Sequence, residues 1–209
     1  MKISIDGLSG TGKTACSKLL AQKLHYKVFN TGNLYRMIGL QLISNNIDPD
    51  DIKSIKKVLE KTKLSIKNNR YYVNNLDVTE VLEKDLVALT VTKYSAVEAV
   101  KEYIRKYQKK FIEENKNIIM EGRDIAEKIM KNADIKFYLY ADINTRAKII
   151  SKKRPNLTLE EVKIELLSRD EYDIKTSNFM KPKNAIEINI CNKNENEILE
   201  IMLKHINVN

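Results

Sequence analysis

The chain has 209 residues, of which 43% are hydrophobic, which suffices for one sizeable core but not for two full domains. Its 37 Lys and Arg residues exceed its 28 Asp and Glu residues, and the resulting net charge of +9 suits polyanionic ligands. No stretch approaches the ~18 apolar residues of a membrane span, and a strand pattern starts almost at Met1, so we expect no membrane segment and no signal peptide. Cys16 and Cys191 lack metal-ligand spacing and should be reduced thiols, which favours a cytoplasmic location.

The first apolar run, residues 2–5, leads into a glycine-rich segment that reads G-x-x-x-x-G-K-T. Its glycines let the backbone curl so that successive N–H groups point into one concavity and hold a polyphosphate. Lys13 would reach the β and γ phosphates, the Thr14 hydroxyl would hold Mg²⁺, and the helix that begins at about Lys13 adds its positive end. The pattern predicts a nucleoside triphosphate site formed by Gly7, Leu8, Ser9, Gly10, Thr11, Gly12, Lys13, Thr14 and Ala15.

A second strand is expected over residues 26–29, followed by a turn and a helix with apolar residues at helical spacing from Leu34. Asn33 is the expected N-cap of this helix. Arg36 then falls in the first turn, where a cation opposes the helix dipole. Arg36 either points at an anion or is a solvated surface residue, and this segment alone leaves both interpretations open.

After a helix expected over residues 51–61, the hydrophobic period changes to that of strands. Short extended runs at 64–66, 71–73 and 76–78 are separated by Asn-Asn pairs that suit tight turns. These connections are too short for crossovers between parallel strands, so the pattern predicts an antiparallel meander in an inserted subdomain.

Two helices follow, over residues 85–95 and 97–114, and the second is rich in lysine. A basic helix is usually a solvated face, but a nucleic-acid surface remains an alternative. Tyr103 and Tyr107 lie one helical turn apart on it and either stack on bases or, more often for such pairs, pack on the core.

A third core strand over residues 117–120 ends in Glu121-Gly122-Arg123-Asp124, and charges at the carboxyl end of a buried strand mark the ligand edge of a parallel sheet. The remaining elements are described by their order along the chain. They are a strand at 135–140, a helix at 143–151, a long helix opened by a capping box at 158–161, a strand at 185–190 and a helix at 195–206. Strands alternating with helices indicate a three-layer α/β fold with a five-stranded parallel sheet.

These motifs together resemble bacterial cytidylate kinase, a branch of the nucleoside monophosphate kinases. The matching segments are Ile5 to Thr14, Thr31-Gly32 with Tyr35-Arg36, Gly122-Arg123-Asp124, and Arg169-Asp170 with Asp173. The resemblance covers nearly the whole chain and implies one P-loop kinase domain over residues 1–209. Within it, residues 34–115 would form the monophosphate-binding subdomain, including the meander at 64–78, and residues 148–176 would form a helical lid.

The resemblance also implies roles for individual residues, with ATP as phosphoryl donor, CMP or dCMP as acceptor, and Mg²⁺ as cofactor. Lys13, Arg123 and Arg169 would be catalytic. The acceptor would be bound by Thr31, Arg36, Thr92, Lys101, Arg123, Asp124, Arg169 and Asp173, with Asp124 facing the cytosine. Thr14 would hold the metal. Small nucleotides are the expected partners, with no nucleic acid and no membrane, and a monomer is expected.

The chemistry of phosphoryl transfer supports these residue types independently. A monophosphate acceptor is already ionised at neutral pH, so the enzyme needs no general base and instead must neutralise two anions held in line. Guanidinium groups suit this task because they are permanently charged and bidentate toward phosphate. An ionised Asp124 would accept from the amino group of cytosine and repel the O4 of uracil.

The chain departs from the family pattern at several positions that bear on base selectivity. Gly-Arg-Asp is followed by Ile125-Ala126-Glu127 where the family has a Gly-Thr step, and Ile149 and Ile150 replace an arginine pair of the lid. Thr176 replaces an arginine expected past Asp173.

Two other functions remain as alternatives. A P-loop kinase of another monophosphate or of a hydroxyl compound is the first, and a hydroxyl acceptor would need a carboxylate base such as Asp6 or Glu121. A basic P-loop protein that binds nucleic acid through residues 97–114 is the second.

Overall fold

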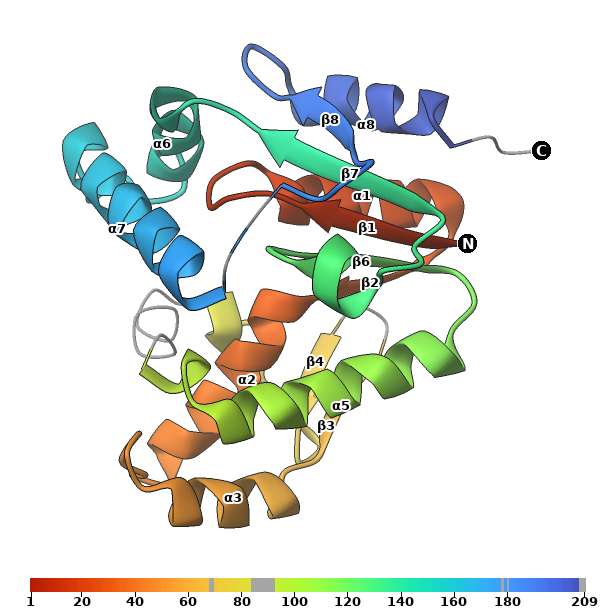
Figure 1. Ribbon diagram of the computed structural model, residues 1–209. Helices are drawn as coiled ribbons and strands as arrows, with labels where there is room; N and C mark the ends of the chain where they lie inside the picture. The colour runs from red at the N-terminus through yellow and green to blue at the C-terminus, as the bar shows by residue number, and fades with distance from the viewer. Residues whose placement is uncertain (68–69, 84–92, 178, 180, 207–209) are drawn as a thin grey trace. The chain divides into compact units, whose positions relative to one another are not determined.

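A computed structural model of the chain describes residues 1–67, 70–83, 93–177, 179 and 181–206 (Figure 1). The chain divides into two compact units, one made of Met1–Phe29 and Lys116–Asn209 and the other of Asn30–Asn115. The first unit carries the glycine-rich loop, and each unit is described separately below.

The first unit is built on a five-stranded sheet in the order β2-β6-β1-β7-β8. The strands are β1 (Lys2–Asp6), β2 (Lys27–Asn30), β6 (Ile118–Gly122), β7 (Ile135–Tyr140) and β8 (Ile186–Asn189). β1 lies between β6 and β7 and pairs in parallel with both, and β7 pairs in parallel with β8. The predicted five-stranded parallel sheet is therefore confirmed.

Five helical segments complete the described part of this unit. They are α1 (Lys13–Leu24), α6 (Ile143–Ser151), α7 (Leu159–Ser177), α8 (Glu195–Lys204) and a short π-helix, η2 (Ile125–Ile129). Leu20 of α1 and Met202 of α8 are fully buried with Ile3 and Phe137 of the strands, in one hydrophobic core. Figure 1 shows α6 and α7 side by side, joined by a core that includes Ala147 and Val162.

The start of α7 confirms the predicted capping box. The Thr158 N–H donates to Glu161 Oε2 at 2.8 Å, and the Glu161 N–H donates back to Thr158 Oγ1 at 3.3 Å. This reciprocal pair satisfies two of the N–H groups that a helix leaves without intrahelical acceptors.

The second unit contains α2 (Thr31–Ser44), α3 (Ile52–Lys61), η1 (Val81–Glu83) and α5 (Glu98–Glu114) with a separate antiparallel sheet. That sheet is formed by β3 (Leu64–Lys67), β4 (Arg70–Val73) and β5 (Leu76–Asp77), as the sequence predicted. Asn74 and Asn75, between β4 and β5, have φ angles of 50° and 68°, the left-handed conformation that a two-residue hairpin turn requires. Most of the helix predicted over 85–95, including Thr92, lies outside the described residues.

The prediction that Asn33 caps α2 was wrong. Asn30 is the N-cap, because its side chain accepts from the Asn33 N–H at 3.0 Å, and the helix starts at Thr31. Arg36 therefore lies beyond the first turn of α2, and its position gives no helix-dipole argument for an anion.

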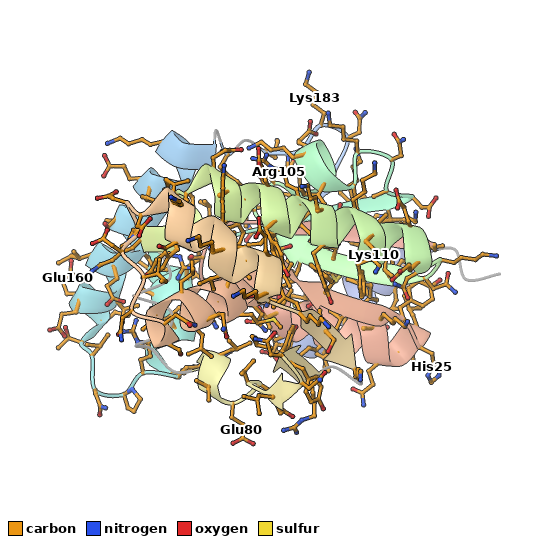
Figure 2. The ribbon with its side chains drawn as sticks, turned by 90° about the horizontal axis from the view of Figure 1, so that it is seen from below. His25, Glu80, Arg105, Lys110, Glu160 and Lys183 are labelled. Carbon is orange, nitrogen blue, oxygen red and sulfur yellow. The ribbon has the colours of Figure 1, made fainter. Side chains whose placement is uncertain are left out.

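The lysine-rich face of α5 is solvent-exposed. Figure 2 shows Arg105 and Lys110 projecting from this helix, and both are exposed. The opposite face packs inward: Val100, Ile104 and Gln108 are buried, and the hydroxyl of Tyr103 donates to Thr62 O. Tyr103 and Tyr107 are both half-buried, so the structure favours the packing interpretation of both tyrosines. Among the described residues, none of the helices combines the length and apolar character needed to cross a bilayer.

Candidate active site

The glycine-rich loop joins β1 to α1 and depends on glycine for its shape. Gly7 has a φ of 155°, and a Cβ there would lie 2.4 Å from Leu139 O on the neighbouring strand. Gly12, with a φ of 71°, is the residue before α1. Both conformations are strained for residues with side chains, so the sequence spacing and the observed loop agree.

Lys13 opens α1 and is only 6% exposed. Its Nζ donates to Leu8 O at 2.7 Å and lies 3.4 Å from Thr11 Oγ1, so the amine lies over its own loop. Burial, and then the charge of Arg123, hold the Lys13 pKa well below its usual range. A bound anion would raise the Lys13 pKa again, because an opposite charge favours the protonated amine.

Glu121 ends the buried part of β6 and is 3% exposed. Burial raises the Glu121 pKa, while Lys13 and a hydrogen bond to Thr14 act in the opposite direction. No group of three or more His, Cys, Asp or Glu residues suited to a metal occurs in the described part of the chain. Mg²⁺ nevertheless commonly takes one or two protein oxygens together with substrate phosphates and water, so the Thr14 hydroxyl and the Glu121 carboxylate fit that ion.

Arg123 follows β6 directly and lies against the glycine-rich loop. Its Nε donates to Asp173 Oδ2 at 2.7 Å, Nη1 donates to Gly7 O at 3.2 Å and Nη2 donates to Ser9 Oγ at 2.5 Å. Asp173 comes from α7, so one guanidinium connects the loop with a helix about 50 residues further along the chain.

Two further predicted residues of this unit have different surroundings. Asp124 pairs with Lys128 Nζ at 2.9 Å, one turn further on. Arg169 is exposed on α7, and its positive charge also lowers the Lys13 pKa. The structure thus brings Lys13, Arg123 and Asp173 together with the loop, with Arg169 close enough to act on Lys13 electrostatically.

The second unit holds other predicted residues. Thr31 is the first residue of α2, and its hydroxyl accepts from Gln108 Nε2 at 3.3 Å. Arg36 Nη1 donates to Leu82 O at 3.0 Å. Lys101 is half-buried on α5. The sequence analysis did not predict Gln108, although a glutamine on the apolar face of a helix is a usable signal, since a buried amide needs partners.

A second residue that the sequence did not reveal is Arg146, on α6. It is 5% exposed, pairs with Asp170 of α7 at 2.7 Å, and donates from Nη1 to Ser9 O at 3.1 Å. The one signal in the sequence is an arginine on the apolar face of an amphipathic helix. Such a residue is rarely fully buried without a partner.

The positions that depart from the family pattern have structural roles here. The Glu127 carboxylate accepts from the Lys183 N–H at 2.8 Å, and Ala126 is buried. Ile149 packs against the core of the sheet and Ile150 against the core between α6 and α7. The side chain of Thr176 lies outside the described residues.

The parallel sheet, the glycine-rich loop at its centre and the arginine that contacts this loop define a P-loop kinase. The family model for cytidylate kinase matches residues 3–208, and the chain belongs to that family.

Relatives of similar length support this membership. The cytidylate kinase of Fusobacterium nucleatum is 33% identical over 210 residues, which cover 98% of this chain and 96% of that protein. The cytidylate kinase of Caldanaerobacter subterraneus is 34% identical over 215 residues, covering 100% and 96%.

Two solved structures resemble this one at low identity and bear on the fold alone. An uncharacterized protein from Eubacterium ventriosum has a TM-score of 0.54 at 12% identity, covering 100% of this chain and 99% of that one. A shikimate kinase from Bacteroides thetaiotaomicron has a TM-score of 0.51 at 9% identity, covering 98% and 97%.

Proposed function

We propose that the chain transfers the γ-phosphoryl group of ATP to CMP, and to dCMP, giving ADP and the cytidine diphosphate. The observation that carries this proposal is the position of Arg123, which contacts Gly7 and Ser9 of the glycine-rich loop. If Arg123 binds the phosphate of CMP from this position, it holds that phosphate next to the phosphates of ATP in the glycine-rich loop.

In the proposed step an ionised phosphate oxygen of CMP attacks the γ-phosphorus of ATP, the bond to the β-γ bridging oxygen breaks, and ADP leaves. No proton has to be removed, so no general base is needed. Asp6, a candidate base for a hydroxyl acceptor, already accepts two backbone hydrogen bonds. The chain's task is therefore to neutralise charge and to align the two anions.

On the donor side, we assign the backbone of residues 7–15 to the phosphates of ATP. Lys13 would exchange its hydrogen bond to Leu8 O for contacts with the β and γ phosphates. A phosphate binds the charged amine more strongly than a neutral carbonyl does. The Thr14 hydroxyl and the Glu121 carboxylate are the protein groups that would hold Mg²⁺, which would supply positive charge to the phosphates.

On the acceptor side, we assign Thr31, Arg36 and Arg123 to the phosphate, and Arg169 with Asp173 to phosphate and ribose. Asp124, with weaker contributions from Thr92 and Lys101, would recognise the cytosine. We further propose that residues 34–115 are the monophosphate-binding subdomain and that residues 148–176 act as a lid. The chain would work as a cytoplasmic monomer on small nucleotides.

An acceptor panel tests the proposal. The full chain is incubated with ATP, Mg²⁺ and one of CMP, dCMP, UMP, AMP, GMP or shikimate, and kcat/KM is measured for each. CMP and dCMP should lead, and shikimate should be inert. Efficient turnover of shikimate or a purine monophosphate with little turnover of CMP would refute the assignment.

A further inference from the structure

Asp6 is a completely buried carboxylate at the end of β1, immediately before Gly7. Its Oδ1 accepts from the Ile125 N–H at 2.7 Å, and its Oδ2 accepts from the Ala126 N–H at 2.9 Å. Both oxygens are thus used by two consecutive backbone groups that lie about 120 residues away in the sequence.

The two donors open η2, the π-helix Ile125–Ile129. Asp124 occupies the N-cap position of η2, but its side chain makes no capping hydrogen bond there. The first N–H groups of a helix have no intrahelical acceptors and need partners from elsewhere. Asp6 supplies them from another strand, and so anchors the start of this turn to β1.

Arg123 and Asp124 lie in the chain between two contacts with Asp6. On one side of this pair, Gly122 is the register partner of Asp6 in the parallel β1–β6 ladder. On the other side, Ile125 is held by the Asp6 side chain. The backbone of both residues therefore runs between two attachments to a single residue of β1, and Arg123 reaches the glycine-rich loop from there.

Stability alone does not explain a charge at this position. A carboxylate removed from water is costly, and an apolar residue of similar size often replaces a buried charge without loss of stability. An apolar side chain could not, however, bind two adjacent N–H groups and fix their direction.

We propose that Asp6 is a positioning residue for the acceptor site: through Ile125 and Ala126 it fixes the backbone that presents Arg123 and Asp124 to the monophosphate. The inference rests on the proposed function, since it concerns the same acceptor.

The test compares the wild type with Asp6→Asn and with Ile3→Val. Asparagine keeps the shape and one acceptor but turns an NH₂ group toward the second N–H. Ile3→Val is the matched control, because Ile3 is also fully buried in β1 but belongs to the hydrophobic core. KM for CMP, KM for ATP, kcat and the thermal midpoint are measured for each full-length protein.

Asp6→Asn should raise KM for CMP about 10-fold or more and lower the preference for CMP over UMP, with KM for ATP changing by less than about 2-fold. Ile3→Val should lower the thermal midpoint and leave both KM values unchanged. If Asp6→Asn folds and leaves KM for CMP and the base preference unchanged, or raises both KM values equally, Asp6 does not position the acceptor site. A wild type that fails to phosphorylate CMP refutes the proposed function instead.

Asp6→Glu is the second variant, should Asp6→Asn fail to fold. It keeps the charge and both acceptor oxygens, but its side chain is longer by one methylene group and should shift the two N–H groups. It should likewise raise KM for CMP selectively. Amide hydrogen exchange on the wild type adds a measurement that needs no variant. The Ile125 and Ala126 amides should be protected, and exchange at the rate of an unstructured chain would contradict the proposed anchoring.

Discussion

Arg146 and Asp170 form a buried ion pair between α6 and α7, with 2.7 Å between Nη1 and Oδ2 and side chains that are 6% and 10% exposed. The same guanidinium donates to Ser9 O of the glycine-rich loop. One side chain thus connects the loop to both helices of the region proposed as the lid.

Breaking this pair should destabilise the protein strongly. Asp170→Asn leaves the Arg146 charge buried without its carboxylate, which typically costs about 3 kcal/mol or more and lowers the melting temperature of a chain this size by roughly 6 to 12 °C. The control is Glu171→Gln at the next position, where the partner Lys175 and the carboxylate are both exposed. Calorimetry should show a large shift for the first variant only; equal midpoints would mean that the pair contributes nothing to stability.

Arg36→Lys should impair catalysis although the charge is kept. A lysine ammonium cannot form the two parallel hydrogen bonds that a guanidinium makes with a phosphate. We expect a higher KM for CMP and a lower kcat in steady-state assays. Arg105→Lys, on the exposed face of α5, is the control and should behave as the wild type. Unchanged kinetics in Arg36→Lys would show that Arg36 does not bind the acceptor phosphate.

Asp124→Asn should change base selectivity more than ATP use. An amide can donate as well as accept, so it should no longer exclude an oxygen at the 4-position of the pyrimidine. Loss of one charge-assisted hydrogen bond, about 1.5 to 3 kcal/mol, predicts a roughly 10- to 150-fold fall in kcat/KM for CMP and a lower ratio of CMP to UMP.

Lys128→Met is the control for Asp124, because it removes the partner at 2.9 Å and keeps the carboxylate. It should retain the preference for CMP. Were Asp124→Asn to lower activity on every acceptor equally, the carboxylate would serve the metal or the structure, and the cytosine would be recognised elsewhere.

The parallel sheet and the loop could be predicted because each is encoded locally. The short apolar run at 118–120 is typical of a strand buried in a parallel sheet, and the glycines at 7 and 12 match positive φ angles. The capping box at Thr158 was equally readable, since both of its partners lie within four residues.

The contacts of the site could not be predicted, because their partners are far apart in sequence. Arg123 contacts Ser9 and Asp173 only in the folded chain, where the end of β6, the loop after β1 and helix α7 lie close together. The π-helix at 125–129 has its first N–H groups bound by a carboxylate of β1, which is distant in sequence. Five residues are also too few for a hydrophobic period that would predict this helix. The position of the α2 cap was misjudged for a different reason, because Asn30 and Asn33 are equally good capping residues.

The stability of the protein should depend on the ionisation of Asp6. Burial is the main cause that raises the Asp6 pKa from its ordinary value of 3.8 to about 6, against two backbone hydrogen bonds that lower it. A pKa raised by folding means that the native state binds the proton more tightly. The stabilising contribution is thus fully present below pH 3.8 and is lost as the pH rises through about 6. The loss amounts to about 3 kcal/mol.

Urea unfolding between pH 4 and pH 7.5 measures this contribution. The difference in free energy of unfolding, wild type minus Asp6→Asn, should fall as the pH rises to about 6 and then level off. A pH-independent difference would show that Asp6 does not titrate in this range.

Product analysis by ³¹P NMR tests phosphoryl transfer to CMP most directly. The wild type and Lys13→Ala are each incubated with ATP, CMP and Mg²⁺, after circular dichroism has confirmed that both are folded. The wild type should form CDP and ADP in equal amounts, and Lys13→Ala should do so at least ~100-fold more slowly, because the cation that follows the β and γ phosphates is gone. Formation of ADP without CDP by the wild type, or near-normal CDP formation by a folded Lys13→Ala protein, would contradict a CMP kinase that works through this glycine-rich loop.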